Sequence, residues 1–363
     1  MMFHDCYRKR RVLLTGHTGF KGSHLAYWLR ELGAELLGVA LPPEQGEPNH
    51  WELLNLDVNS RFLDIRNAEE LERTFREFRP EAVFHLAAQA LVRPGYADPA
   101  ATFAVNTSGV VNVLEACRKT EGVRAVVVVT SDKCYENRET RRRFREDDPL
   151  GGRDPYSASK GCAEIVTACY RQSFFSPDEY SKHGVLLASA RAGNVVGGGD
   201  WARDRLIPDL VRAAAAGRRA HLRNPEAVRP WQHVWEPLSG YLALGEKLLA
   251  GETRFSGAWN FGPSSKRGVT VREAAEIMAE RWPEIEFTAA SRPEGPYEAK
   301  TLRLDCSKAA RELDWRGVWS ARRALQYTAD WYREFYEHGR AATAGQFKLY
   351  LDAAEKAEAA WMN

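Results

Sequence analysis

The sequence has few cysteines and no long hydrophobic run, and both absences exclude classes of protein. Its six cysteines are irregularly spaced and form no CxxC pair, so we expect neither a disulfide framework nor a metal site. Reduced thiols favour a cytoplasmic protein. No window approaches the length of a membrane span, and the apolar run near the N-terminus is too short for a secretory signal. We therefore expect no membrane partner.

The chain also lacks a charge excess of either sign. Lysine and arginine number 51 against 49 acidic residues, a formal net charge of +2, so nothing in the overall charge predicts a nucleic-acid partner. The basic runs at 8–11 and 138–145 are interpreted as solvated surface. At 363 residues, 44% of them hydrophobic, the chain is long enough for one large domain or two lobes.

Short β-branched runs alternate with helical patterns over the first half of the chain. Strands are predicted at 11–16, 35–41, 82–88, 125–130 and 185–191, and helices at 22–32, 68–78, 107–117 and 156–172. This alternation predicts an α/β fold with right-handed βαβ units in a doubly wound parallel sheet.

Past residue 195 the pattern loosens, and glycine, proline and tryptophan become more frequent. We predict a dinucleotide-binding domain over 8–195, to which about 231–263 returns, because "GAWNFG" (257–262) is typical of another strand of the sheet. A smaller, interleaved α/β substrate-binding lobe is predicted over about 196–230 and 264–350.

The glycine-rich stretch "TGHTGFKG" directly follows the first predicted strand and opens the first predicted helix. Gly16 would permit a tight turn, Gly19 would let the backbone approach a pyrophosphate, and Gly22 would allow close helix–strand contact. The helix N-terminus supplies unpaired N–H groups and the positive end of a dipole. This context predicts dinucleotide binding rather than a purely structural turn.

The choice of dinucleotide depends on the residues after the second strand. An acid usually stands there to hold the ribose hydroxyls, but the strand ends "VALPPEQG", with Glu44 three residues late. No arginine is present there for a 2′-phosphate, which favours NAD over NADP. Asp64 is interpreted as an adenine contact, or alternatively as the N-cap of the helix over 67–78.

Two further stretches carry candidate chemistry. Tyr156 and Lys160 are four residues apart on a predicted helix and hence on one face. There Lys160 could hold a nicotinamide ribose and, with the cationic ring, lower the tyrosine pKa from ~10. The alternative is a solvated pair.

The second stretch, "VVVVTSDKCY", begins as a strand buried on both faces and then presents Ser131, Asp132 and Lys133. Residues just beyond the carboxyl end of a parallel strand point into the ligand crevice, which places this trio opposite Tyr156. The alternative is that Asp132 and Lys133 pair with each other at a solvent edge. Such a polar group is costly at this position unless a substrate contacts it.

In this order, "TGHTGFKG", "HLAAQA", "TSD" and "YSASK" resemble the extended short-chain dehydrogenase/reductase superfamily over essentially the whole chain. Four longer stretches, "TSDKCYENRE", "RAGNVVGGGDWARDRLIPD", "RNPEAVRPWQHVWEPLSGY" and "LRLDCSKAARELDW", are similar to CDP-glucose 4,6-dehydratases. The resemblance implies a Rossmann-type fold, NAD as cofactor, and a hydro-lyase acting on a nucleotide sugar. Another nucleotide-sugar dehydratase or a 4-epimerase of the same fold is the alternative, and a catalytically silent regulatory protein is a rival from another class.

The resemblance also implies roles for single residues. Tyr156 would remove the proton of the sugar 4-hydroxyl while the C4 hydride passes to NAD, with Ser131 polarising the C4 oxygen. Asp132 would protonate the departing 6-hydroxyl. Lys133 stands where dTDP-glucose relatives carry Glu, and is interpreted as the base for the C5 proton or as an electrostatic stabiliser of the enolate.

The remaining implied contacts are to the cofactor and to the substrate. For the substrate they are Asn194, Arg205, Arg229 and Tyr297, the first alternatively a turn-capping residue and the two arginines alternatively surface residues. For NAD they are Gly16, Thr18, Gly19, Phe20, Gly22, Asp64, Ile65, Leu86, Ala87, Ala88, Tyr156 and Lys160. Relatives commonly dimerise through the helix carrying Tyr156 and its neighbour, so a homodimer or homotetramer is expected.

Overall fold

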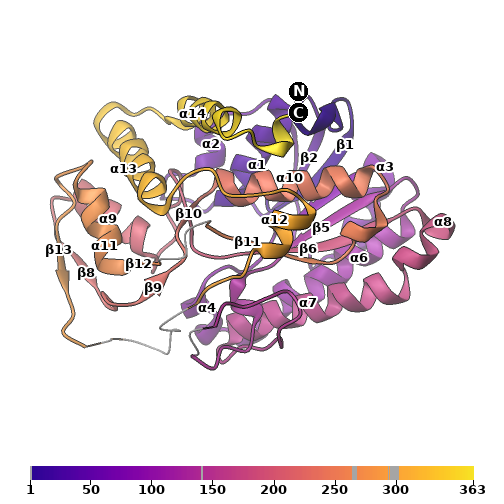
Figure 1. Cartoon of the computed structure of the whole chain (residues 1–363), viewed down its shortest axis with the longest axis horizontal. Helices are drawn as coiled ribbons and strands as arrows, with labels where there is room; N and C mark the ends of the chain where they lie inside the picture. The colour runs from indigo at the N-terminus through magenta and orange to yellow at the C-terminus, as the bar shows by residue number, and fades with distance from the viewer. Residues whose placement is uncertain (1, 140–141, 264–267, 293, 295–301) are drawn as a thin grey trace.

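The computed structural model describes residues 2–139, 142–263, 268–292, 294 and 302–363 (Figure 1). Its central element is a seven-stranded sheet in the order β11-β6-β5-β4-β1-β2-β3, in which every pairing is parallel. The strands are β1 (Arg11–Thr15), β2 (Glu35–Ala40), β3 (Asn59–Phe62), β4 (Ala82–His85), β5 (Ala125–Val129), β6 (Leu186–Ala192) and β11 (Ala258–Phe261). The strand order reverses between β1 and β4, and in open α/β sheets ligands bind at such a reversal.

Helices cover both faces of the sheet, and each face has its own hydrophobic core. The helices α1 (Phe20–Glu31), α10 (Trp235–Leu249) and α14 (Thr343–Lys356) contribute to one core. The helices α3 (Ala68–Phe78), α6 (Gly109–Lys119) and α7 (Pro155–Ser173) contribute to the other. Successive valines of β5 alternate between the two cores because side chains along a strand point to opposite faces. The valine run is therefore a strand buried on both faces, as predicted.

Shorter helices connect these elements. They are α2 (His50–Leu54), α4 (Val92–Ala97), α5 (Pro99–Phe103), a π-helical turn (Ala104–Ser108) that runs into α6, α8 (Tyr180–His183) and α12 (Ser307–Glu312).

A second group of elements lies beside the sheet, at the left of Figure 1, and has its own core around Trp201, Trp231 and Trp331. Its helices are α9 (Leu206–Ala215), α11 (Val271–Ala279) and α13 (Ala321–His338). Its strands form three pairs: β8 (Ala220–Leu222) with β13 (Phe287–Ala289), β9 (Val228–Arg229) with β12 (Val269–Thr270), and β7 (Val195–Val196) with β10 (Gln232–His233). The residue bounds of the two predicted lobes stay a prediction.

The C-terminal segment returns to the N-terminus, so the two ends of the chain lie side by side (Figure 1). The backbone N–H of His4 donates to the carbonyl of Asn363 over 2.9 Å. The ring of Trp361 stacks on Phe3 with the centroids 5.4 Å apart. These contacts close the core formed by α1, α10 and α14.

The doubly wound parallel sheet predicted from the sequence is confirmed, and so is the return of the chain, because β11 pairs with β6 at the sheet edge. Most predicted strand ends differ from the structure by one residue, and the strand predicted over 82–88 shows the largest difference. The strand expected over 82–88 ends at His85, because the next backbone amides, of Leu86 and Ala87, turn to donate to the hydroxyl of Thr15 over 3.1 and 3.2 Å.

Within the described ranges, none of the helices combines the length and the apolar character needed to span a bilayer.

Candidate active site

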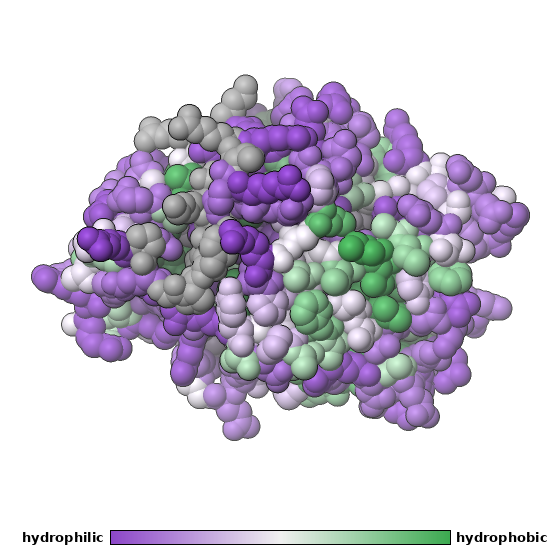
Figure 2. Space-filling model, turned by 90° about the horizontal axis from the view of Figure 1, so that it is seen from below, coloured by the Kyte–Doolittle hydropathy of each residue, from purple (hydrophilic) through white to green (hydrophobic). Residues whose placement is uncertain are grey.

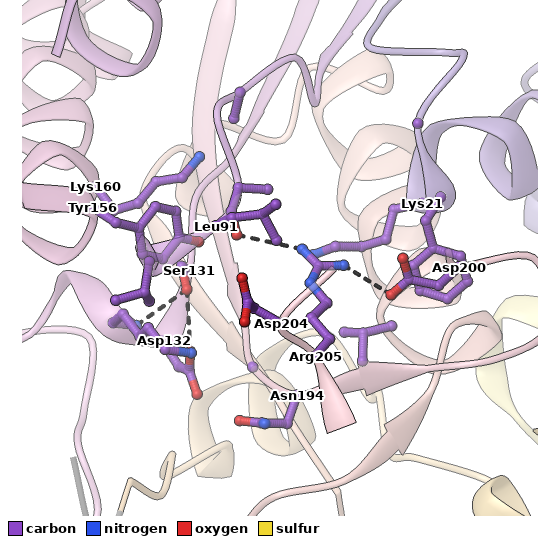
Figure 3. Close-up of a pocket in the computed structure, with 18 of the residues that line it drawn as sticks. Lys21, Leu91, Ser131, Asp132, Tyr156, Lys160, Asn194, Asp200, Asp204 and Arg205 are labelled. Carbon is purple, nitrogen blue, oxygen red and sulfur yellow. Dashed lines mark hydrogen bonds and ion pairs between the residues drawn. The ribbon is translucent and has the colours of Figure 1, made fainter. Parts of the chain in front are cut away.

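A cavity of about 570 Å³ opens at the carboxyl ends of the central strands (Figure 3). This volume lies in the usual range of small-molecule sites. Every predicted site residue except Tyr297 lines it, and Tyr297 lies outside the described residues. The lining residues are Gly16, Thr18, Gly19, Phe20, Gly22, Asp64, Ile65, Leu86, Ala87, Ala88, Ser131, Asp132, Lys133, Tyr156, Lys160, Asn194, Arg205 and Arg229.

The glycine turn between β1 and α1 has the shape that a pyrophosphate requires. A Cβ on Gly16 would lie 2.7 Å from the backbone nitrogen of Ala87, and one on Gly22 would lie 1.9 Å from the carbonyl oxygen of Gly16. A Cβ on Gly19 would meet only that same oxygen, at 3.4 Å, and would otherwise project into open space. Gly19 is also the N-cap of α1 and provides no side-chain cap. The N–H groups of the first turn are therefore left for a ligand, and the residues present fit a dinucleotide.

Asp64 lies at the same end of the cavity as β2 and β3. Its carboxylate accepts from the Arg66 side chain over 2.6 Å and from the Arg66 backbone over 2.9 Å, and these bonds lower its pKa. The N-cap of α3 is Asn67, whose side chain accepts from the backbone N–H of Glu70. The alternative interpretation of Asp64 as the cap of this helix is therefore wrong. Glu44 is exposed and does not line the cavity.

The polar residues after β5 form a 3₁₀ turn, Asp132–Cys134, capped by the Ser131 side chain. The Ser131 hydroxyl accepts from the backbone N–H of Lys133 over 3.2 Å and donates to Oδ1 of Asp132 over 3.1 Å. Lys133 Nζ lies 3.9 Å from the same Oδ1. Asp132 is fully buried, while a third of the Lys133 side chain is exposed. Asp132 and Lys133 therefore pair with each other, as in the alternative interpretation, but the carboxylate of the pair is buried in the cavity and does not lie at a solvent edge.

The position of the Asp132 carboxylate is set by the backbone after β6. A Cβ at Gly193 would lie 1.7 Å from Oδ2 of Asp132, so no other residue fits there without displacing the acid. Within the described part of the chain, Oδ2 has no hydrogen-bond partner although it is buried. A buried carboxylate oxygen of this kind calls for a polar ligand group or a proton.

Tyr156 and Lys160 lie on the first two turns of α7, which Asp154 caps by accepting from the backbone N–H of Ser157 over 2.9 Å. Both side chains are buried and face the cavity (Figure 3). Burial raises the Tyr156 pKa, and the charge of Lys133 and hydrogen bonding with Ser131 act against burial. The prediction that Lys160 is the cation lowering this pKa is not supported, because Lys133 exerts the stronger effect. Burial lowers the pKa of Lys160 to about 8.

A buried polar network lies behind these residues. The carboxylate of Glu164, on α7, accepts from the Thr130 hydroxyl over 2.5 Å and from the Ser189 hydroxyl and the Arg191 guanidinium over 2.7 Å each. Arg191 also donates to the Tyr135 hydroxyl over 2.7 Å, which links the 3₁₀ turn to β6. The network thus connects α7 with the ends of β5 and β6, which carry the polar residues of the site.

The substrate-side residues come from the segments after β6. Asn194 has a left-handed backbone, φ 43°, and its side-chain Oδ1 is buried without a partner among the described residues, which does not support a turn-capping role. Arg205 donates to Asp200 over 2.9 Å and to the carbonyl of Ala90 over 3.3 Å (Figure 3). Arg229 lies in β9 and donates to the carbonyl of Val228 over 3.1 Å. Arg205 and Arg229 both line the cavity, so neither is a plain surface residue.

Among the charged residues that line the cavity and were not predicted from the sequence are Lys21 and Asp200. Lys21 is the second residue of α1, and a charged side chain in the first turn of that helix was the available signal. Asp200 follows a glycine run, and no local pattern predicts that it pairs with Arg205. Nowhere in the described ranges do three or more His, Cys, Asp or Glu side chains gather in a way that could hold a metal ion.

Known proteins share both the sequence and the fold. The sequence model of the GDP-mannose 4,6 dehydratase family matches residues 13–328. A CDP-glucose 4,6-dehydratase of Salmonella typhimurium is 45% identical over 335 residues, which are 92% of this chain and 93% of that protein.

Solved structures superpose over most of the chain. UDP-glucose 4-epimerase of Thermus thermophilus, in complex with NAD, has a TM-score of 0.74 at 28% identity, over 89% of this chain and 99% of the other. A double mutant of DesIV, a dTDP-glucose 4,6-dehydratase of Streptomyces venezuelae with NAD bound, has a TM-score of 0.74 at 25% identity, over 89% and 97%. These matches confirm the resemblance to the extended short-chain dehydrogenases/reductases. On the evidence of its fold, its cavity and these relatives, the chain belongs to the GDP-mannose 4,6 dehydratase family.

Proposed function

We propose that the protein is a nucleotide-sugar 4,6-dehydratase that converts CDP-glucose into CDP-4-keto-6-deoxyglucose. The observation that carries this proposal is the meeting of Ser131, Asp132 and Lys133 with Tyr156 at one cavity. An acid, a second proton-accepting group and a phenol around one sugar are what an elimination needs in addition to a redox step. The choice of CDP-glucose is supported by the 45% identity to a curated CDP-glucose 4,6-dehydratase.

NAD is the proposed cofactor. The glycine turn and the first turn of α1 would hold its pyrophosphate, Asp64 its adenosine half and Lys160 its nicotinamide ribose. Apolar Ala40 and Leu41 line the cavity at the end of β2, which supports NAD over a dinucleotide with an extra phosphate. Bound NAD would accept a hydride from C4 of the sugar and return it to C6, so the reaction involves no net oxidation.

The protein's own residues would move the protons. Tyr156 takes the proton of the 4-hydroxyl, and Ser131, which hydrogen-bonds with Tyr156, orients the C4 oxygen. The C5 proton next to the resulting ketone goes to Lys133, and buried Asp132 protonates the departing 6-hydroxyl, which leaves as water. When the hydride is added at C6, Lys133 returns a proton to C5. In the alternative role a protonated Lys133 stabilises the enolate while a water molecule removes the C5 proton.

A 4-epimerase is the second candidate, since a UDP-glucose 4-epimerase shares the fold. Epimerisation at C4 uses the tyrosine and the cofactor but requires no catalytic role for Asp132 or Lys133. The burial of Asp132 against Gly193 therefore favours the dehydratase.

The test is a product assay with CDP-, dTDP-, UDP- and GDP-linked glucose, followed by nuclear magnetic resonance. We expect a 4-keto-6-deoxy sugar from CDP-glucose, with deuterium placed at C4 recovered at C6 and solvent deuterium incorporated at C5. Loss of the C4 label to water, or a C4 epimer as the product, would contradict the proposed reaction.

We further propose that the protein is a homodimer in the cytoplasm, with α7 at the interface. Figure 2 shows hydrophobic residues gathered on the face along which α7 runs at the bottom of Figure 1. Ile165 and Phe174 are 58% and 45% exposed there. Burial of such a face against a second copy removes apolar surface from water. A monomer mass in sedimentation would contradict the dimer.

The cytoplasmic location is supported by free thiols, among them the buried Cys117 and Cys134.

A further inference from the structure

The buried carboxylate of Asp132 depends on one neighbour for protons. None of its side chain is exposed, and within the described ranges the Ser131 hydroxyl is the only group that hydrogen-bonds to it, over 3.1 Å. Lys133 Nζ lies 3.9 Å from Oδ1, which is too far for a hydrogen bond. An acid that protonates a leaving group must regain a proton in every turnover. The source of that proton is therefore expected on the other side of Ser131.

The Ser131 hydroxyl connects Asp132 with Tyr156. It donates its proton to Oδ1 of Asp132 and accepts from the backbone N–H of Lys133 over 3.2 Å. Ser131 also hydrogen-bonds with Tyr156, beside which it lies in Figure 3. A hydroxyl has one donor and two acceptor positions, so Tyr156 is the donor in this last bond. The bonds run in one direction, from Tyr156 through Ser131 to Asp132.

Tyr156 is neutral in the resting site. Burial raises its pKa above the ordinary value of ~10, and the opposing charge of Lys133 does not cancel this effect. A neutral phenol can take the proton of a sugar hydroxyl only if it gives up its own proton at the same time. The bonds to Ser131 and Asp132 provide a route for that proton.

We propose that Ser131 relays a proton from Tyr156 to Asp132 during C4 oxidation, so that the proton of the sugar 4-hydroxyl supplies the one that later leaves with the 6-hydroxyl. This inference rests on the proposed function. The C4–H bond breaks and its hydride passes to the nicotinamide, while the O4 proton moves to Tyr156. The Tyr156 proton moves to Ser131, and the Ser131 proton moves to Asp132.

The relay balances the protons of the whole reaction. After C4 oxidation Tyr156 and Ser131 are as they began, and Asp132 holds one more proton. When the C6–O bond breaks, that proton leaves with the 6-hydroxyl as water. The C5 proton goes to Lys133, and Lys133 returns a proton to C5 as the hydride is added at C6. The sugar loses one water molecule, and the protein ends in its starting state.

The relay gives Asp132 a second role, as the final proton acceptor in C4 oxidation. Without the relay, Asp132 acts only at C6. CDP-linked xylose separates these cases, because xylose has no C6 and can undergo only the oxidation at C4.

The experiment measures the reduced nicotinamide that forms from NAD and CDP-xylose at equilibrium, by its absorbance, from about pH 6 to about pH 9. The variants are Asp132→Asn, Ser131→Ala and Ser131→Thr. The matched control is Asp178→Asn, which changes an exposed aspartate.

Several titratable side chains face Asp132 and Tyr156 and affect any measurement against pH. They are Lys133 and Cys134 on the 3₁₀ turn, Lys160 on α7, Lys21 on α1, Arg205 before α9 and Tyr241 on α10. Burial lowers the pKa of Lys21 to about 7 and that of Lys160 to about 8, so both titrate in this range. The informative quantity is therefore the difference in pH dependence between wild type and variant.

In wild type the O4 proton stays on Asp132, whereas in Asp132→Asn it must go to the solvent. We expect Asp132→Asn to form about tenfold less reduced nicotinamide, or lower still, near neutral pH. Relative to wild type, its ratio of reduced to oxidised nicotinamide should rise about tenfold per pH unit, because one proton is released. Ser131→Ala should show the same rise, and Ser131→Thr, which keeps the hydroxyl, should retain the wild-type dependence.

A wild-type pH dependence in Asp132→Asn would overturn the proposal, even with less reduced nicotinamide, because a purely electrostatic effect of the carboxylate gives that result. If Asp132→Asn does not fold, Ser131→Ala decides by the same criterion. If CDP-xylose does not react with wild type, the first appearance of reduced nicotinamide from CDP-glucose is compared by rapid mixing. A wild-type rate in Asp132→Asn then overturns the proposal, and a rate lower by about tenfold or more supports it. Failure of the proposed function would be seen separately, as absence of a 4-keto product from CDP-glucose with wild-type protein.

Discussion

Lys133 and Tyr156 meet where the end of β5 faces the first turn of α7. The charge of Lys133 is the strongest influence holding down the Tyr156 pKa, which burial raises. We therefore propose two roles for Lys133. It removes the C5 proton, and its positive charge lowers the Tyr156 pKa so that the phenolate forms at a lower pH. Lys133 Nζ lies 3.9 Å from Oδ1 of fully buried Asp132, so the proposed base and the proposed acid are next to each other.

The change Lys133→Met tests both effects. We expect the rate of product formation to fall by about 10²- to 10⁴-fold, the usual contribution of a general base, and solvent deuterium to disappear from C5. The Tyr156 pKa should rise further when the cation is lost, so any residual activity should shift to higher pH. The exposed residue Lys348 gives the control, Lys348→Met. Full turnover with C5 exchange in Lys133→Met would exclude Lys133 from the chemistry.

At the scale of elements, the ion pair between Glu164 and Arg191 connects α7 with β6. Both side chains are almost fully buried, at 2% and 4% exposure, and their nearest atoms are 2.7 Å apart. Thr130, the residue directly before the polar turn, donates to the same carboxylate. The distance between the turn and the helix, and hence between Ser131 and Tyr156, therefore depends on this pair.

Removal of one partner should destabilise the protein strongly, because it leaves an uncompensated buried charge. For Arg191→Met we expect a loss of about 3–5 kcal/mol in the free energy of unfolding, measured with urea, and a lower kcat with little change in KM. The double variant Glu164→Gln/Arg191→Met should recover part of the loss. Removal of the exposed pair Glu179–Lys182 should leave the free energy of unfolding nearly unchanged, because solvent screens an exposed ion pair. A single variant as stable and active as wild type would show that the pair does not position the site.

At the scale of the whole molecule, Glu236 on α10 holds the C-terminal part of the chain against the sheet. Its carboxylate accepts from the backbone N–H groups of Val318 and Trp319 over 2.8 and 2.5 Å and from the Tyr350 hydroxyl over 3.1 Å. The side chain is buried, and burial raises its pKa to about 7. The folded protein therefore binds a proton here at pH values where an unfolded glutamate has lost it.

This difference predicts a stability that falls as the pH rises. The contribution of Glu236 is largest below its unfolded pKa and decreases by about 3 kcal/mol as the pH rises through the folded pKa of about 7. Urea unfolding of wild type at pH 5 and pH 8 should show this decrease, and Glu236→Gln should abolish most of it. Exposed Glu355 provides the control, Glu355→Gln. If the free energy of unfolding of Glu236→Gln depends on pH as strongly as that of wild type, the raised pKa of Glu236 is not the cause of the dependence.

Local patterns in the sequence determined the elements and most of the site. The valine run predicted a strand between two cores, the glycines predicted the turn before α1, and the spacing of Tyr156 and Lys160 predicted one helix face. These inferences succeeded because strand alternation, helical periodicity and backbone freedom act over a few neighbouring residues. Ser131, Asp132 and Lys133 could be placed at the cavity since the carboxyl end of a buried parallel strand faces the crevice.

Only the tertiary structure decided which charges are buried and which partners they have. Asp132 is fully buried because Gly193 of another segment packs on it, and buried Glu164 on α7 has its ionic partner, Arg191, on β6. The cation that most lowers the Tyr156 pKa is Lys133 rather than the lysine on the same helix. Such properties depend on contacts between segments distant in sequence, and desolvation and Coulomb interactions respond to those contacts rather than to local spacing.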